Sequence, residues 1–148
     1  HALVSAPWEK PRVLKELSVF QRIQEVLGGV MLANVAYPAF NPRPAILAPE
    51  LISLAHDNRD WITVTDDLSI QLLADTIGGT GEDVLKHALL AGNDVLLTTA
   101  PPDWDKGLDY VGLLVRFAKE DPAARKKIDD AARRVLRLKD RMGLLDEL

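Results

Sequence analysis

Helical segments and short apolar runs alternate along this chain, and the alternation is the feature that most restricts its fold. Three runs rich in aliphatic and β-branched residues are predicted to be strands, at residues 30–37, 61–66 and 93–102. Their apolar residues are continuous, which is typical of strands that are covered on both faces. Strands of this kind, separated by helices, predict an α/β protein with a parallel sheet.

Amphipathic helices are expected between and after these strands. In the first helix, Pro11 suits the opening turn and Gly28 suits the end. Ser69 is expected to cap a short helix, Gly92 is expected to end a longer one, and the segment GGTG is expected to be a loop. The expected helices cover residues 10–29, 49–58, 68–76, 82–92, 104–119 and 122–142, and the last carries an apolar stripe of Ile128, Ala132, Val135 and Leu138.

Two architectures fit this order of elements: an open, doubly wound sheet, and part of a (β/α)8 barrel. A barrel needs eight strands and typically about 250 residues, whereas the chain has 148 residues and three predicted strands. On the barrel interpretation, residues 1–148 are a single domain, the C-terminal portion of the barrel with about three βα units plus terminal helices. Three parallel strands alone leave two unpaired edges, so we then expect that the chain does not fold stably by itself.

Composition excludes several classes of function. The net charge of −4 gives no general attraction to nucleic acid or anionic membranes, and aspartates interrupt the basic segment 124–141, as expected for a solvated helix face. The chain has no cysteine, no apolar run near the roughly 20 residues of a membrane span, and no cluster with metal-ligand spacing. We therefore expect no nucleic-acid partner, no membrane span and no metal, and we leave the compartment open.

Two adjacent carboxylates, Asp66 and Asp67, stand where the second predicted strand ends. In both architectures chemistry gathers at the carboxyl ends of the strands, so this position favours a functional site. The alternative is structural: Asp67 or Ser69 caps the next helix and Asp66 is solvated. Strand alternation does not choose between the two carboxylates. We expect the carboxyl ends of all three strands to converge on one concave site, at residues 31–35, 62–65 and 95–98.

Four segments carry motifs in a specific order: VMLANVAYPAFNPRPA, WITVTDDLSI, AGNDVLLT and IDDAARRVLRLKDRMGLL. They resemble the family 3 glycoside hydrolases, and most closely the bacterial β-N-acetylhexosaminidase branch. Relatives commonly read V-M-x-A-H-V-x-Y-P, S-D-D-L-S-M, A-G-x-D and R-R-x-L-x-x-K-x-x-x-G-L at these places. The resemblance implies the C-terminal part of a TIM-type catalytic barrel. It also implies a retaining glycosidase that releases terminal β-linked N-acetylhexosamine (GlcNAc) through a glycosyl-enzyme intermediate, with no cofactor.

The resemblance implies roles for individual residues. Asp66 matches the family's catalytic nucleophile, and Asp67 then supports it or caps the following helix. The family's acid/base is a His in a D-S-H loop, and His1 falls close to that position; an imidazole can give and take a proton near neutral pH. Relatives usually place Pro four residues after this His, whereas Pro7 stands six residues after His1. The alternative is that His1 is only the start of the chain.

Three residues are weaker candidates for substrate binding. Asn34 stands where relatives often have His, Tyr37 is able to stack on a sugar face, and Arg43 lies on a loop after a strand. The family's K-H-F-P-G-H-G motif is absent, so the expected partners are a carbohydrate substrate and an N-terminal part of the same barrel, preceding His1.

Two alternatives to this enzyme stay open. Asn34 and the shifted His1 motivate a catalytically silent, barrel-derived protein that binds sugar or a partner. The other alternative is a β-glucosidase of the same family. The D-D-L-S context speaks against it, because glucosidases of this family more often place Trp after the nucleophile.

Overall fold

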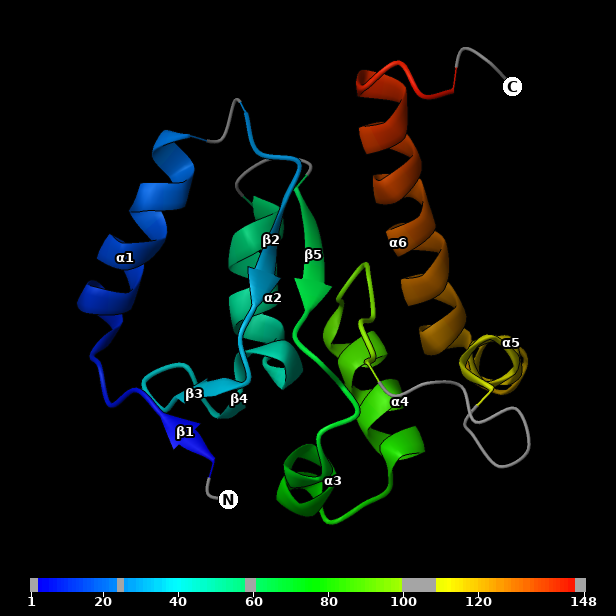
Figure 1. Cartoon of the computed structure of the whole chain (residues 1–148), viewed down its shortest axis with the longest axis horizontal. Helices are drawn as coiled ribbons and strands as arrows, with labels where there is room; N and C mark the ends of the chain where they lie inside the picture. Colours follow the sequence, from blue (N-terminus) through cyan, green and yellow to red (C-terminus); the bar gives the residue numbers. More distant parts are fainter. Residues whose placement is uncertain (1–2, 24–25, 58–60, 100–108, 146–148) are drawn as a thin grey trace.

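The structure, a computed structural model, describes residues 3–23, 26–57, 61–99 and 109–145. Its elements are β1 (Val4–Ser5), α1 (Lys10–Arg22), β2 (Gly29–Leu32), β3 (Val35–Tyr37), β4 (Asn41–Pro44), the 3-10 helix η1 (Ala45–Leu47), α2 (Pro49–Asp57), β5 (Ile62–Thr65), α3 (Gln71–Ile77), α4 (Gly81–Ala91), α5 (Tyr110–Glu120) and α6 (Pro122–Arg141). Figure 1 shows β2 and β5 side by side, with α1 on one side of the pair and α6 on the other.

The central strands β2 and β5 are parallel, with Gly29 opposite Ile62 at the start of the register. A side chain at Gly29 would collide with the Ile62 carbonyl, so glycine permits this close approach. We call the segment 94–99 the third strand. It runs beside β5, where Val95 forms a parallel bridge with Val64. The parallel order confirms the predicted α/β fold of a partial barrel type, although the third strand makes a single bridge and residues 100–102 of its predicted range lie outside the described residues.

The predicted strand at 30–37 is in fact two strands, so the prediction of one strand was wrong. After β2 the chain turns at residues 33–34 and continues as β3, which pairs in parallel with β1 and antiparallel with β4. The apolar pattern does not show this bend because β3 has its own buried contact, Ala36. β4, which was expected to be loop, contains two prolines, and a sheet edge tolerates them because its outward N–H groups have no strand partner.

Prolines and glycines mark several helix ends correctly. α1 has Pro11 in its first turn, but it ends at Arg22, well before Gly28. α3 begins at Gln71, and the prediction that Ser69 caps it was wrong, because the helix has no side-chain cap. Ser69 instead donates from its N–H and its hydroxyl to Asp67 Oδ1.

The segment GGTG joins α3 to α4 rather than a strand to a helix. Gly78 ends α3 with φ of +64°, a left-handed conformation that glycine adopts without strain. Thr80 caps α4: its hydroxyl accepts from the Asp83 N–H, and the Asp83 carboxylate accepts from the Thr80 N–H at 2.8 Å. Gly92 ends α4, as predicted.

The last two helices, α5 and α6, pack against each other. Residues 104–108 of the predicted helix at 104–119 lie outside the described residues. Asp121 caps α6 by accepting from the Ala123 N–H at 2.9 Å. Ala132 is exposed, whereas Ala124 and Ala131 are buried, so the prediction of Ala132 in the apolar stripe was wrong by one residue.

The main core lies among α3, α4, α5 and α6, next to η1. Its buried members are mostly aliphatic, and Asn93 joins them because its Nδ2 donates to the carbonyls of Ile46 and Ala88. Leu96 of the third strand packs against this core. The core comprises Ile46, Leu47, Leu68, Leu73, Ala74, Val84, Leu85, Ala88, Leu89, Phe117 and Ala124.

No described helix combines the length and apolar character needed to cross a lipid bilayer.

Candidate active site

Asp66 directly follows β5, at the end of the molecule toward which the arrowheads of β2 and β5 point (Figure 1). Its main-chain N–H donates to the Leu32 carbonyl at 3.0 Å. Each oxygen of its partly buried carboxylate accepts one main-chain hydrogen bond, Oδ1 from Asp67 N at 2.8 Å and Oδ2 from Asn34 N at 3.2 Å. Two amide donors hold a carboxylate in one orientation and stabilise its negative charge. This arrangement suits a nucleophile.

Asp67 has different partners. Its Oδ1 accepts from the Ser69 N–H at 2.9 Å, the Ser69 hydroxyl at 2.7 Å and the Thr99 N–H at 3.1 Å, while its Oδ2 accepts from the Thr99 hydroxyl at 2.5 Å. Burial raises the pKa of Asp67, but the hydrogen bonds from Thr99 and Ser69 outweigh it and lower the pKa from 3.8 to about 2. Asp67 therefore stays ionised at any ordinary working pH.

Asn34 lies at the bend after β2 and contacts both aspartates. Its main-chain N–H donates to Asp66, and its side-chain Nδ2 donates to the Asp67 carbonyl at 3.1 Å. Its Oδ1 is buried and has no hydrogen-bond partner among the described residues. Asn34 after β2, the aspartates after β5, and Thr99 at the end of the third strand are thus joined by hydrogen bonds at one rim. The structure brings these strand ends together.

The other predicted site residues are not joined to the aspartates. Tyr37 lies on β3, with its ring centroid 6.2 Å from that of Trp8. Arg43 is exposed on β4, and its main-chain N–H donates to Asn41 Oδ1. Within the described ranges, neither the Tyr37 nor the Arg43 side chain hydrogen-bonds to an aspartate of the pair. His1 lies outside the described residues.

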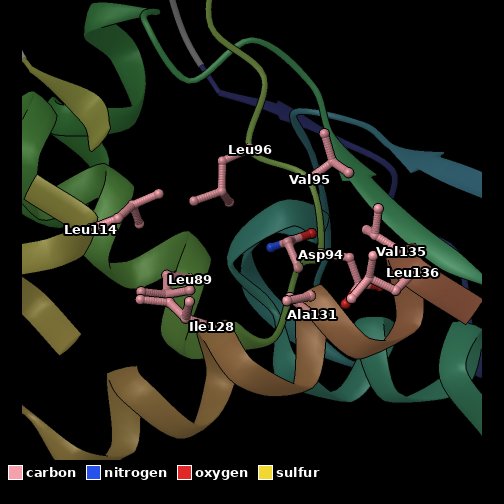
Figure 2. A pocket seen from close by; sticks show the side chains of 11 residues that line it. Leu89, Asp94, Val95, Leu96, Leu114, Ile128, Ala131, Val135 and Leu136 are labelled. Carbon is pink, nitrogen blue, oxygen red and sulfur yellow. The ribbon is translucent and has the colours of Figure 1, made fainter. Parts of the chain in front are cut away.

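Two cavities formed by described residues lie apart from the carboxylate pair. A cavity of about 540 Å³ lies between the third strand and helices α4, α5 and α6, and its wall is almost entirely aliphatic (Figure 2). Another, of about 220 Å³, lies between α1 and β2, with Trp8 and Tyr37 in its lining. Neither lining includes Asp66 or Asp67.

A buried carboxylate, Asp94, lies near the start of β5, away from the rim. Its side chain is fully buried and accepts from Arg134 Nε at 2.7 Å and Thr63 N at 2.8 Å, and His56 Nε2 lies 3.0 Å from its Oδ2. Burial raises the pKa of Asp94, but bonds from His56, Thr63 and Arg134 give a net lowered pKa. Asp94 therefore joins α2, β5 and α6 and has a structural role.

Sequence reasoning gave no role to Thr99, which makes two of the four hydrogen bonds to the Asp67 carboxylate. Thr99 lies within the third predicted strand, at residues 93–102, and a hydroxyl residue at that place does not by itself identify a partner. No group of three or more His, Cys, Asp or Glu side chains within the described ranges could hold a metal ion.

The parallel strands, with carboxylates at their carboxyl ends, define an α/β protein of partial barrel type with an acidic rim, and sequence comparison identifies the family. Residues 7–138 match the model of the glycosyl hydrolase family 3 N terminal domain. The chain belongs to glycoside hydrolase family 3, which confirms the resemblance seen in its motifs. No curated protein sequence matches the chain.

Several solved structures share the fold. A glycoside hydrolase family 3 beta-N-acetylglucosaminidase from Paenibacillus sp. str. FPU-7 is 26% identical, with a TM-score of 0.80 over 97% of this chain and 28% of that one. A beta-N-acetylhexosaminidase from Beutenbergia cavernae DSM 12333 is 27% identical, with a TM-score of 0.77 over 95% and 41%. A beta-glucoside phosphorylase at 18% identity and a TM-score of 0.73, over 98% and 28%, shares the fold alone. The chain thus spans well under half the length of these relatives.

Proposed function

We propose that the protein is a retaining glycoside hydrolase that releases terminal β-linked N-acetylhexosamine, with Asp66 as its nucleophile. The observation that carries this proposal is the Asp66 carboxylate, held by two main-chain amides at a strand end in a family 3 domain. The sugar class is supported by the two structural relatives at 26% and 27% identity, a beta-N-acetylglucosaminidase and a beta-N-acetylhexosaminidase.

The chemistry proceeds in two displacements. An Asp66 oxygen attacks the anomeric carbon while the bond from that carbon to the leaving-group oxygen breaks, and a general acid protonates the leaving group. Water then attacks the same carbon, loses a proton to the same group acting as base, and releases the Asp66 carboxylate. Two inversions at one carbon retain its configuration. We assign the acid/base role to His1, because an imidazole exchanges protons near neutral pH.

The other rim residues have supporting roles in this proposal. Asp67 and Asn34 hold the nucleophile, since their hydrogen bonds converge on it. We assign to Tyr37, whose ring lies next to that of Trp8, a contact with the apolar face of a sugar ring. Arg43, exposed on β4, is available to a more distant part of the carbohydrate. The route needs no cofactor.

The proposed macromolecular partner is an N-terminal part of the same barrel. In the described residues β2 pairs on one side only, with β5, and the third strand likewise has one strand neighbour. Met31 on β2 is 62% exposed, although such strands are normally covered in α/β folds. Further βα units would pair with these edges and cover this side chain.

A catalytically silent sugar-binding protein is the second candidate. It is favoured by Asn34, which replaces the His that relatives often carry and which leaves its Oδ1 without a partner in the described residues. The two candidates differ in one respect only: the enzyme forms a covalent bond between the sugar and Asp66.

The test is to trap that bond in the full-length protein. A slow fluorosugar substrate with an N-acetylhexosamine-type ring is expected to label Asp66, and peptide mass spectrometry identifies the labelled residue. Asp66→Ala serves as the control and is expected to take no label. Label on Asp67 would move the nucleophile by one residue. Binding of the sugar without any label would favour the silent protein.

A further inference from the structure

Thr99, at the end of the third strand, holds both oxygens of the Asp67 carboxylate. Its main-chain N–H donates to Oδ1 at 3.1 Å and its hydroxyl donates to Oδ2 at 2.5 Å. Ser69 contributes two further hydrogen bonds, both to Oδ1. Among the residues that the structure describes, the Thr99 hydroxyl is therefore the one donor to Oδ2. No other described side chain replaces it.

The third strand, which carries Thr99, is held in place by hydrogen bonds. The Val95 carbonyl accepts from the Thr65 N–H at 3.0 Å, and the Thr65 hydroxyl accepts from the Leu97 N–H at 2.9 Å. The Leu97 carbonyl in turn accepts from the Leu68 N–H at 3.0 Å. Hydrogen bonds thus tie this strand to β5 and to the residue after Asp67. A group mounted on such an element is held more precisely than one on a free loop.

Asp67 transmits this restraint to Asp66 through its own backbone. Its N–H donates to Asp66 Oδ1 at 2.8 Å, and its carbonyl accepts from Asn34 Nδ2 at 3.1 Å. The side chain of Asp67 is held by Thr99 and Ser69, so the residue is restrained at its amide, its carbonyl and its carboxylate. Rotation of Asp67 would carry its amide away from Asp66.

We propose that Thr99 is a positioning residue for the nucleophile: by holding the Asp67 carboxylate it keeps the Asp67 amide aimed at Asp66 Oδ1. The inference rests on the proposed function, in which Asp66 attacks the anomeric carbon. It deepens that function by adding one residue, Thr99, to the groups that position the nucleophile. The lowered pKa of Asp67, about 2, agrees with this role, because only the ionised carboxylate accepts all four hydrogen bonds.

The expected defect of Thr99→Val is in the rate of attack. Valine keeps the shape and the main-chain N–H of Thr99 and removes only the hydroxyl. Misplacement of a reacting group by about 1 Å can cost about 10²-fold in rate, and Thr99 touches no substrate in this proposal. We therefore expect kcat for an aryl β-N-acetylglucosaminide to fall by about 10- to 100-fold with little change in KM. Thr99→Ser, which restores the hydroxyl, is expected to recover most of the rate.

A neighbouring threonine supplies the matched control. The Thr98 hydroxyl donates to the Tyr110 hydroxyl at 3.1 Å and makes no contact with Asp67 among the described hydrogen bonds. Thr98→Val removes the same group from the same strand and is expected to keep the kcat of the unchanged protein. Thermal unfolding of each variant shows whether it is folded. Equal losses in Thr98→Val and Thr99→Val would overturn the proposal.

A double-mutant cycle tests whether Thr99 acts through Asp67. Asp67→Asn removes the ionised acceptor, so Thr99→Val is expected to lower kcat in the unchanged protein but to add no further loss in the Asp67→Asn background. The same fold-loss in both backgrounds would contradict the proposal. The cycle also gives an answer if Thr99→Val is less stable, because a general loss of stability is expected in both backgrounds.

A spectroscopic readout separates this inference from the proposed function. In protein labelled with 13C at aspartate carboxyls, Thr99→Val is expected to raise the Asp67 pKa toward its ordinary value and to shift the Asp66 signal, while Thr99→Ser leaves both unchanged. If the unchanged protein hydrolysed no glycoside, the proposed function would fail, and these signals would still decide whether Thr99 positions Asp66. An unmoved Asp66 signal in Thr99→Val would overturn the inference.

Discussion

Two neighbouring carboxylates acquire different chemistry because their hydrogen-bond partners differ. Asp66 accepts one main-chain bond on each oxygen, whereas Asp67 accepts four bonds from Thr99 and Ser69. An ionised carboxylate has about four acceptor positions. Asp66 therefore keeps an acceptor position free on each oxygen, while Asp67 accepts three bonds on Oδ1 and one on Oδ2. On this basis we propose Asp66 as the nucleophile and Asp67 as its support.

This difference predicts unequal effects of truncation. In the full-length protein, Asp66→Ala is expected to lower kcat by about 10⁴-fold or more, because it removes the covalent route. Asp67→Ala keeps the main-chain amide that donates to Asp66, so its loss is expected to be smaller, about 10²-fold. Steady-state hydrolysis of an aryl β-N-acetylglucosaminide measures both. The reverse order of losses would exchange the two roles.

The sequence could predict the place of the aspartate pair but not its partners. Asp66 and Asp67 stand at the end of a β-branched run, and parallel strands bring their carboxyl ends to one rim. The hydrogen bond from the Asn34 N–H to Asp66 depends on the bend after β2. The hydrogen bonds from Thr99 to Asp67 depend on the register between the third strand and β5. Both are long-range properties that composition and spacing do not encode. The roles of these residues stay predictions.

At the scale of elements, local signals succeed where they are strong. Pro49 and Pro122 begin helices as expected, and Gly92 ends one. The cap of α4 had a signal as well, because Thr80 and Asp83 have the spacing of a capping box. Hydrophobic periodicity failed at residues 30–37, because one apolar run supplies strands to two different sheets.

Asp94 connects elements that are distant in the sequence. Its carboxylate contacts His56 of α2, Thr63 of β5 and Arg134 of α6, and its side chain is 0% exposed. A buried carboxylate is costly unless such partners satisfy it. Removing it leaves the Arg134 guanidinium, which is 22% exposed, without its acceptor. The attachment of α6 to the strands is therefore expected to depend on the ionised state of Asp94.

The lowered pKa of Asp94 determines how its contribution to stability changes with pH. Folding favours the ionised form, so its contribution is complete above the ordinary aspartate pKa of about 3.9 and is lost as pH falls through the lower folded-state value. Asp94→Asn is expected to lower the free energy of unfolding of the full-length protein by about 3 kcal/mol at pH 7. The difference from the unchanged protein is expected to shrink below about pH 4. Urea unfolding at several pH values measures it.

Asp130 supplies the control for this prediction. It lies on α6 like Arg134, but it pairs at the surface with Lys126 and Arg133. Asp130→Asn is expected to change the unfolding midpoint far less than Asp94→Asn, because exposed ion pairs contribute little. A gap between Asp94→Asn and the unchanged protein that stayed constant from pH 7 to pH 3 would show that Asp94 acts by packing rather than by charge.

The solvent-accessible surface of the whole molecule is larger than that of a compact monomer of the same mass. A compact monomer of 16.3 kDa exposes roughly 7,500 Å², whereas this chain exposes 9233 Å². Part of the excess is apolar: Phe20 on α1 is 46% exposed and Val111 on α5 is 72% exposed. Among the described residues, β2 and the third strand each have one edge without a strand partner, and the backbone groups there are able to pair with another strand.

This surface predicts how residues 1–148 behave when produced alone. We expect no cooperative thermal transition from a monomer. In the part of the chain that the structure describes, two strand edges lack neighbours. The exposed apolar side chains also leave the apolar gain on folding small relative to the entropy of ordering the chain. Circular dichroism during heating, combined with sedimentation to establish the oligomeric state, measures this. The full-length protein is the control and is expected to unfold cooperatively. A sharp transition from a monomer of residues 1–148 would show that these helices and strands suffice for a stable domain, and it would remove the structural reason for proposing further βα units.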